Sequence, residues 1–141
     1  MGLAMDTAAL QAFLARDFGQ VAGDFTVDSV GSEGLVLRLK VTERHLRPGG
    51  TVSGPSLFGL ADVAMYLAIL ARIGPVALAV TTSCSMDFMR KPAAGRDVLA
   101  QARVLKLGRS LAVGDVFLFS EGVPEPVARA GLTYSIPPAK T

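Results

Sequence analysis

The sequence predicts an α+β fold in which an antiparallel sheet wraps around one long apolar helix. The helix is indicated by residues 51–71, where Asp62 is the only ionisable side chain and the other residues are apolar or small. The sheet is indicated by four strand-like segments after this helix, joined by connections too short to hold crossover helices. A helix that is apolar all round must be covered on every side, and a curled sheet provides that cover.

The bulk properties narrow the class of protein further. A chain of 141 residues is most simply one main domain, expected at 25–141, preceded by a helical segment at 1–24. The net charge of +2, without a dense basic stripe, argues against nucleic acid as a partner. The single cysteine, Cys84, excludes an internal disulfide framework and favours a reducing, cytoplasmic location. Asp62 near the centre of the only long apolar segment argues against a membrane span.

The first third of the chain predicts a helix followed by a hairpin. Residues 6–21 place their large apolar side chains on one helical face, which indicates an amphipathic helix closed by Gly19 or Gly23. Apolar residues then alternate with polar or partly exposed ones through 35–41, as in a half-buried strand. The glycines at 31 and 34 predict a hairpin turn with a partner strand at 25–30, and a turn-rich loop leads to the central helix.

The central helix is expected to begin at Ser53-Gly54-Pro55, because serine caps helices and proline is tolerated in the first turn. Strands are then expected at 76–89, 97–107, 110–119 and 127–136. Within this helix the lone carboxylate of Asp62 is costly to bury unless it is paired, protonated or used in chemistry. That conflict makes Asp62 the first candidate for a functional residue.

Three segments, in the correct order, carry a resemblance to a known family. Gly50, Thr51, Gly54 and Leu60-Ala61-Asp62 match the helix entrance of PaaI-like acyl-CoA thioesterases, and 86–98 and 104–116 resemble the family's following strand and hairpin. The resemblance covers roughly residues 25–136 and implies the hotdog fold, an antiparallel sheet wrapped around a central helix. The sequence departs from the family pattern at Arg47, where the family has asparagine, and at Ser53, where it has histidine.

The resemblance implies the roles of three catalytic residues. The backbone N–H of Gly54, at the positive end of the helix dipole, would polarise the thioester carbonyl. Asp62 would act as base or nucleophile, reaching across a dimer interface to the Gly54 of another copy. Thr81 or Thr82 would supply a hydroxyl that positions water. Each residue also has a simpler explanation, namely a permissive turn, a hydrogen-bonded structural carboxylate and an ordinary strand residue.

The substrate-binding candidates fall into two groups. Arg90, Lys91 and Arg109, with Ser110 beside the last, would contact the phosphates of coenzyme A, although cationic loop residues are more often only solvated. The acyl-group and helix-entrance candidates are Arg47, Ser53, Phe58, Met65 and Tyr66. Ser53 is explained equally well as a helix cap.

The expected activity is hydrolysis of a small or aromatic acyl-CoA by a homodimer or homotetramer, with no cofactor beyond the coenzyme A of the substrate. No histidine–cysteine cluster suggests a metal, and His45, the only histidine, matches no family position. The first alternative is a hotdog protein that binds acyl-CoA or a small acid without cleaving it, favoured if Arg47 neutralises Asp62 as an ion pair. The less favoured alternative is a hotdog hydratase or dehydratase, since that class normally has a histidine that this helix lacks.

Overall fold

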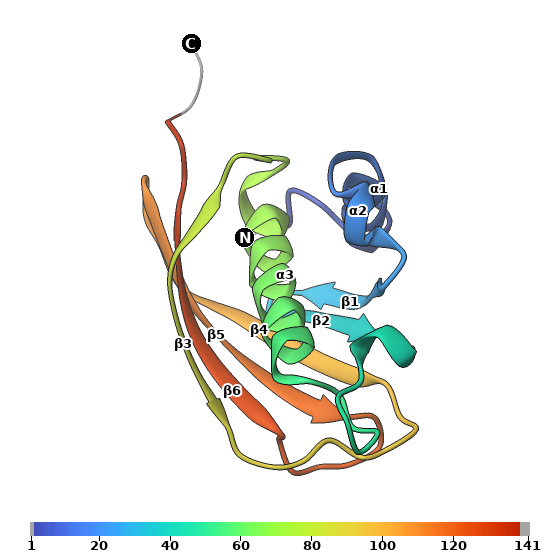
Figure 1. Ribbon diagram of the computed structural model, residues 1–141. Helices are drawn as coiled ribbons and strands as arrows, with labels where there is room; N and C mark the ends of the chain where they lie inside the picture. Colours follow the sequence, from blue (N-terminus) through green and yellow to red (C-terminus); the bar gives the residue numbers. More distant parts are fainter. Residues whose placement is uncertain (1, 139–141) are drawn as a thin grey trace.

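A computed structural model describes residues 2–138, and in it one long helix, α3 (Gly54–Ile73), lies in the concave face of a curved sheet (Figure 1). Ser53 caps the helix, because its hydroxyl oxygen accepts the backbone N–H of Ser56, and Pro55 lies in the first turn as expected. Gly74 ends the helix at a positive φ of 93°. From Val63 to Ala71 every residue of α3 is buried, so this half of the helix forms the centre of the core.

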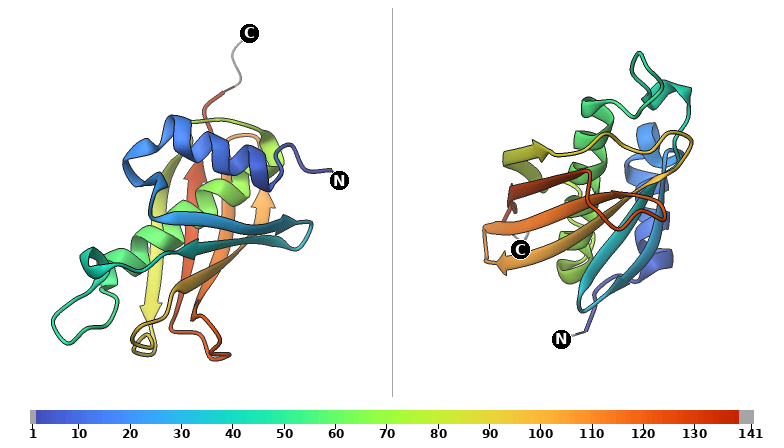
Figure 2. Two further views of the ribbon diagram at one scale, coloured as in Figure 1. Left: turned by 90° about the vertical axis from the view of Figure 1, so that its right-hand side faces the viewer. Right: turned by 90° about the horizontal axis from the view of Figure 1, so that it is seen from below.

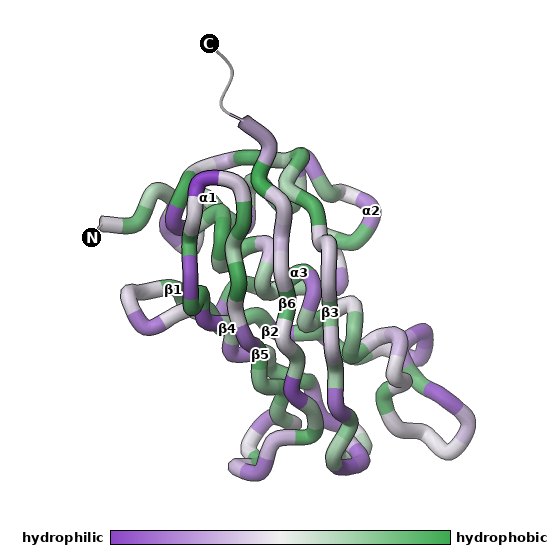
Figure 3. The backbone as a smooth tube through the Cα atoms, turned by 90° about the vertical axis from the view of Figure 1, so that its left-hand side faces the viewer, coloured by the Kyte–Doolittle hydropathy of each residue, from purple (hydrophilic) through white to green (hydrophobic). Residues whose placement is uncertain are grey.

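The sheet has six antiparallel strands in the order β1-β2-β4-β5-β6-β3, which confirms the predicted α+β class and the wrapped-helix architecture. The strands are β1 (Phe25–Gly31), β2 (Gly34–Leu39), β3 (Val80–Phe88), β4 (Val98–Leu107), β5 (Leu111–Ser120) and β6 (Ala128–Ser135). β1 and β3 form the two edges. Figure 3 shows β3 beside β6, its hydrogen-bonded neighbour within the described residues.

Both edge strands carry an irregularity of one residue. The pairing of β1 with β2 shifts between Val27 and Ser29, and the pairing of β3 with β6 shifts between Thr81 and Ser83. Each shift leaves one extra residue on the edge strand, as in a β-bulge, and reverses which side chains face the helix on either side of it.

The N-terminal segment packs beside the C-terminal half of α3 (Figures 1 and 2). It contains α1 (Thr7–Asp17) and the short α2 (Gly19–Ala22), so the predicted single helix over 6–21 is interrupted at Phe18. Leu10, Phe13 and Leu14 are buried, and the Phe13 ring lies 6.1 Å from that of Tyr66 on α3. The proposed boundary between 1–24 and 25–141 therefore crosses one shared core; residues 1 and 139–141 of those ranges lie outside the described residues.

Two local expectations need correction. The strand expected at 76–89 begins only at Val80, because the N–H of Ala79 bonds to the carbonyl of Val76 and closes a turn before the strand. The loop after β2 contains a 3₁₀ turn, η1 (Glu43–His45), that the sequence did not indicate.

α3 is long and apolar enough to cross a membrane, but two thirds of its most apolar window is buried inside the protein, as a core helix requires.

Candidate active site

Asp62 lies at the edge of a cavity of about 380 Å³ between α3, β3, β6 and the junction of α1 and α2. The carboxylate is half-buried and projects from α3 toward the start of β3. Its Oδ1 atom accepts hydrogen bonds from the hydroxyls of Thr81 and Tyr134, each at 2.6 Å. Within residues 2–138 no cation lies within ion-pairing distance of Asp62, so the charge is held by neutral donors alone.

The β3 bulge decides which threonine faces Asp62. Thr81 is paired with Tyr134 across the two strands, so both side chains lie on the helix-facing side of the sheet. Thr82 is the extra residue, is exposed, and donates to the carbonyl of Thr133 at 3.3 Å. Of the two threonines that the sequence left open, Thr81 is the one placed at the carboxylate.

The walls of the cavity are mostly apolar and aromatic. They are formed by Phe18, Val63, Tyr66, Ala77, Ala79 and Val80, with Asp17 at the rim. The hydroxyl of Tyr66 donates to the carbonyl of Ala77 at 2.9 Å, and its ring stacks on Tyr134 at 6.1 Å and 22°. Burial, and then the charge of Asp17, raise the pKa of Tyr66. The cavity therefore joins an apolar chamber to the carboxylate of Asp62, with a second carboxylate, that of Asp17, at its rim.

Cys84 does not provide an alternative nucleophile. It lies three residues after Thr81 on β3 and is half-buried. Burial, and then the charge of Asp62, raise the pKa of the Cys84 thiol, so the thiol stays protonated at neutral pH.

Gly54 occupies the first turn of α3, eight residues before Asp62. Its N–H belongs to the helix-terminal donors that have no partner inside the helix, and Pro55 contributes none. The ring of Phe88 lies over Gly54 at ordinary van der Waals distance from where a Cβ would stand. Eight residues of helix correspond to about 12 Å, so Gly54 and Asp62 of one chain cannot contact the same carbonyl group.

The other predicted binding residues are spread over the molecule. Arg47 is exposed in the loop before α3, and within the described chain it forms no ion pair with Asp62. Ser53 is accounted for by its capping hydrogen bond. Phe58 is 41% exposed on α3 outside the cavity. Met65 is fully buried over Gly114, so Tyr66 rather than Met65 faces the cavity.

The predicted phosphate contacts lie at opposite ends of the sheet. Arg90 and Lys91 follow the end of β3, near the start of α3, and the guanidinium of Arg90 donates to the carbonyl of Pro126 at 3.0 Å. Arg109 and Ser110 lie in the turn between β4 and β5 at the other end. Arg90 bonds to Val127 and Ser110 to Ile136, at opposite ends of β6 and nine residues or roughly 30 Å apart, so the two groups do not form one phosphate site within one protomer.

His45 has a structural role. Its Nδ1 accepts the backbone N–H of Thr42 at 2.9 Å, and its Nε2 faces Asp24 at 3.6 Å, in a buried position outside the cavity around Asp62.

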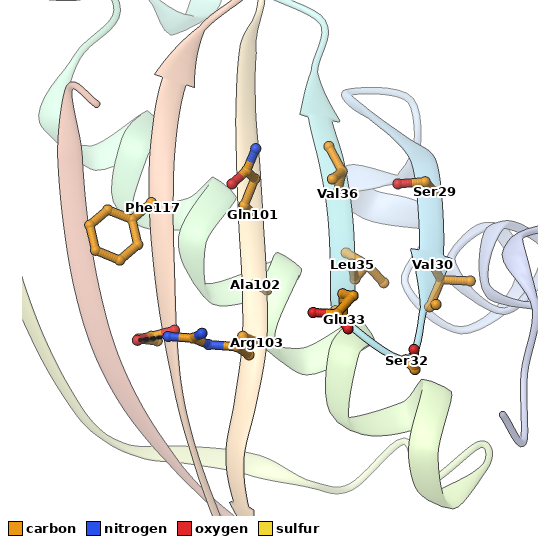
Figure 4. A pocket seen from close by; sticks show the side chains of 13 residues that line it. Ser29, Val30, Ser32, Glu33, Leu35, Val36, Gln101, Ala102, Arg103 and Phe117 are labelled. Atoms are coloured by element: carbon orange, nitrogen blue, oxygen red, sulfur yellow. Dashed lines mark hydrogen bonds and ion pairs between the residues drawn. The ribbon is translucent and has the colours of Figure 1, made fainter. Parts of the chain in front are cut away.

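A larger open cavity, of about 670 Å³, lies on the sheet face away from α3 (Figure 4). It is lined by the β1–β2 hairpin and by Gln101, Arg103 and Phe117, and Arg103 is paired with Asp115 at 3.2 Å. None of the residues predicted from the sequence lies there, and its one arginine is already paired with Asp115. The cavity around Asp62 is the candidate active site.

The family model described as "Thioesterase superfamily" matches residues 49–127, a range that contains Gly54, Asp62 and Thr81. The chain belongs to the thioesterase superfamily. This membership confirms the family resemblance read from the sequence. The matched range includes α3 and β3, the elements that carry Asp62 and Thr81.

Individual relatives agree with this membership. A crystal structure of a candidate thioesterase from Silicibacter sp. TM1040 is 59% identical, covers 98% of this chain and 96% of its own, and superposes with a TM-score of 0.92. A mutant of the phenylacetic acid degradation protein PaaI from Thermus thermophilus is 32% identical over 84% of this chain and 99% of its own, with a TM-score of 0.72. Acyl-coenzyme A thioesterase 13 from Homo sapiens is 29% identical over 82% of this chain and 81% of its own.

The sequence pointed to Gly54, Asp62 and Thr81 but missed Tyr134. Tyr134 occupies an inward position on β6, where an aromatic residue is an ordinary part of a core, and it lies 72 residues from Asp62 along the chain. No spacing signal connects the two. The packing of α3 against β6 brings its hydroxyl to the carboxylate.

Proposed function

We propose that the protein is an acyl-CoA thioesterase that hydrolyses a small or aromatic acyl-CoA to the free acid and coenzyme A. The observation that carries the proposal is the carboxylate of Asp62, which has no ion-pair partner in the described chain and opens onto an apolar cavity. The relatives named for acyl-coenzyme A hydrolysis and phenylacetic acid degradation support the substrate class.

In the proposed reaction Asp62 accepts a proton from water while the water oxygen attacks the thioester carbonyl. The N–H of Gly54 stabilises the oxyanion that forms, aided by the positive end of the α3 dipole. The carbon–sulfur bond then breaks, and the proton held by Asp62 passes to the departing thiolate. The products are a carboxylic acid and a thiol, and the scheme requires neither a metal nor an added cofactor.

This scheme requires a second copy of the chain, because Gly54 and Asp62 of one chain are about 12 Å apart along α3. The open edge of β3 offers a surface on which a second copy can pair. We therefore propose a homodimer, alone or within a homotetramer, in which each site joins Gly54 of one protomer to Asp62 of the other. Arg90 and Lys91 lie near the start of α3 and are proposed to meet the coenzyme A phosphates there.

The shared site has a direct test in mixed oligomers. Asp62→Asn removes the base, and Gly54→Pro removes the N–H at a helix position that accepts proline. Each variant alone is expected to be inactive. Refolding the two together should restore about a quarter of wild-type activity per chain, since half of the dimers are mixed and each mixed dimer has one intact site. A mixture as inactive as its components would contradict the shared site, as would a monomer in light scattering.

The activity itself is tested by hydrolysis of a panel of acyl-CoA esters with detection of the released thiol. Turnover that depends on Asp62 supports the proposal. The binding-protein alternative predicts instead that acyl-CoA binds and no thiol appears; the ion pair between Arg47 and Asp62 that favoured it is not formed within the described chain.

A further inference from the structure

Two hydroxyl groups bind the same oxygen of Asp62. Thr81 Oγ1 and Tyr134 Oη each donate to Oδ1 at 2.6 Å, and Tyr134 Oη also lies 2.9 Å from the backbone carbonyl oxygen of Asp62. Within residues 2–138, Oδ2 has no hydrogen-bond partner. The two oxygens of one carboxylate are therefore differentiated, one fixed by the sheet and the other free of protein donors.

The position of the Tyr134 hydroxyl is fixed by three contacts. Tyr134 pairs with Thr81 on one side and with Ala112 on the other, so the middle of three hydrogen-bonded strands carries it. Tyr134 is 3% exposed, and its ring stacks on that of Tyr66. A side chain held in this way presents its hydroxyl with little freedom, which is what a donor that orients a reacting group requires.

Tyr134 stays a donor over the whole physiological range. Burial, and then its hydrogen bond to the Asp62 carboxylate, raise the pKa of the Tyr134 phenol far above neutrality. A neutral donor orients the carboxylate and leaves its charge in place. An arginine or lysine at the same place would instead cancel that charge.

We propose that Tyr134 is a positioning residue for the hydrolysis: its hydroxyl fixes Oδ1 of Asp62, so that Oδ2 is the oxygen that accepts the proton of the attacking water. The inference rests on the proposed function. It adds Tyr134 to Asp62 and Thr81 as a third residue of the candidate site. Thr81 contributes the second donor to the same oxygen, from the edge strand, whereas Tyr134 contributes from the interior of the sheet.

Tyr134→Phe tests the inference, because it removes the hydroxyl and keeps the stacked ring. The lost hydrogen bond is one to a charged group, so kcat should fall about 10- to 100-fold with KM changed less than about threefold. The acid limb of the kcat/KM profile should move to higher pH, because the charged carboxylate has lost a donor. In an Asp62→Asn background the same change should have little further effect on kcat.

Tyr66→Phe is the matched control, since Tyr66 is a tyrosine of the same cavity whose hydroxyl binds the carbonyl of Ala77 instead of Asp62. It should leave the acid limb in place whatever its effect on KM. If Tyr134→Phe lowers kcat with an unmoved acid limb, or if Tyr66→Phe moves that limb equally, Tyr134 is structural and the inference fails.

A second measurement separates this inference from the proposed function. The carboxyl carbon of Asp62, assigned by comparison with Asp62→Asn, can be titrated by carbon-13 NMR without turnover. Its midpoint should be higher in Tyr134→Phe than in the wild type. Equal midpoints would overturn the inference even if hydrolysis is established, whereas absence of hydrolysis with a shifted midpoint would overturn the proposed reaction and leave only the effect of Tyr134 on the Asp62 carboxylate.

Discussion

Two sites of this protein surround their carboxylates in opposite ways. On the outside of the sheet, Arg38 forms ion pairs with Asp28 and Asp97 at 3.0 Å and with Glu121 at 2.9 Å. Asp62 instead accepts hydrogen bonds from two neutral hydroxyls and has no cation beside it in the described chain. The carboxylates around Arg38 form ion pairs that stabilise the fold, whereas the carboxylate of Asp62 has no ion pair within the described residues and is free to take part in a reaction.

The sharpest test of this comparison, and the largest expected effect, is Asp62→Asn. The variant keeps the size of the side chain but cannot accept a proton, so kcat should fall by about 10²–10⁴. Its melting temperature should hold or rise, because an unpaired, half-buried charge has been removed. Steady-state kinetics and thermal unfolding measure the two quantities. Wild-type turnover in a destabilised variant would show that Asp62 stabilises the fold and does not take part in the reaction.

Arg38→Met should show the reverse pattern. Three carboxylates lose their shared cation and then repel one another, and the partly exposed pairs are each worth up to about 1 kcal/mol, so unfolding should become easier by about 1–2 kcal/mol. Because the network lies at the ends of β1, β2, β4 and β5, away from Asp62, kcat should stay at the wild-type value. Urea unfolding checks the first expectation. A fall in kcat with unchanged stability would show that the ion pairs of Arg38 serve the reaction and not the fold.

Arg90 and Lys91 are cations that, like the carboxylate of Asp62, form no ion pair within the described residues. Replacing both with glutamine should raise KM for acyl-CoA about 2- to 10-fold at unchanged kcat, since contacts to the phosphates are equal in the ground and transition states. Arg96→Gln, which removes another cation of the same loop that, like Arg90, donates to a backbone carbonyl, is the control. An equal rise in KM for Arg96→Gln would indicate general surface charge instead of contacts.

The smallest expected effect concerns Asp24. A hydrogen bond from Arg44 lowers the pKa of the Asp24 carboxyl below its ordinary value of 3.8, with His45 adding a weaker contribution. The resulting stabilisation is present above the unfolded-state pKa and is lost as the pH falls through the lower, folded-state pKa. Acid unfolding below about pH 4 should therefore be less steep for Asp24→Asn than for the wild type. Parallel pH curves would show that Asp24 contributes no acid-sensitive stability.

The fold was readable from the sequence because its strongest signal, a helix apolar all round, admits few solutions. The antiparallel pairing was predicted from the short connections, whereas the order of the strands in the sheet was not predicted. What the pattern did not show was which face of that helix meets the cavity: a helix without a polar face has no periodicity to orient it. Met65 was therefore expected in the pocket, although it lies in the core and Tyr66 faces the cavity.

Only part of the candidate site could be predicted from the sequence, for a similar reason. Asp62 is conspicuous as a lone charge, whereas Tyr134 is inconspicuous as one more inward residue of a strand. The choice between Thr81 and Thr82 depended on a bulge, and no residue pattern near it signals an extra residue. Pairing across strands that are distant in sequence thus supplied what local patterns could not.

The one-residue shifts in β1 and β3 have a consequence for solubility. Both open edges of the sheet are interrupted by an extra residue, at 28 and at 82, so neither presents a long uniform row of free N–H and C=O groups. A strand from an unrelated or misfolded chain finds no extended template for addition at such an edge. The uninterrupted part of β3, residues 83–88, is long enough for one short, defined pairing. The irregularities thus disfavour growth into open-ended aggregates while they leave room for a closed assembly.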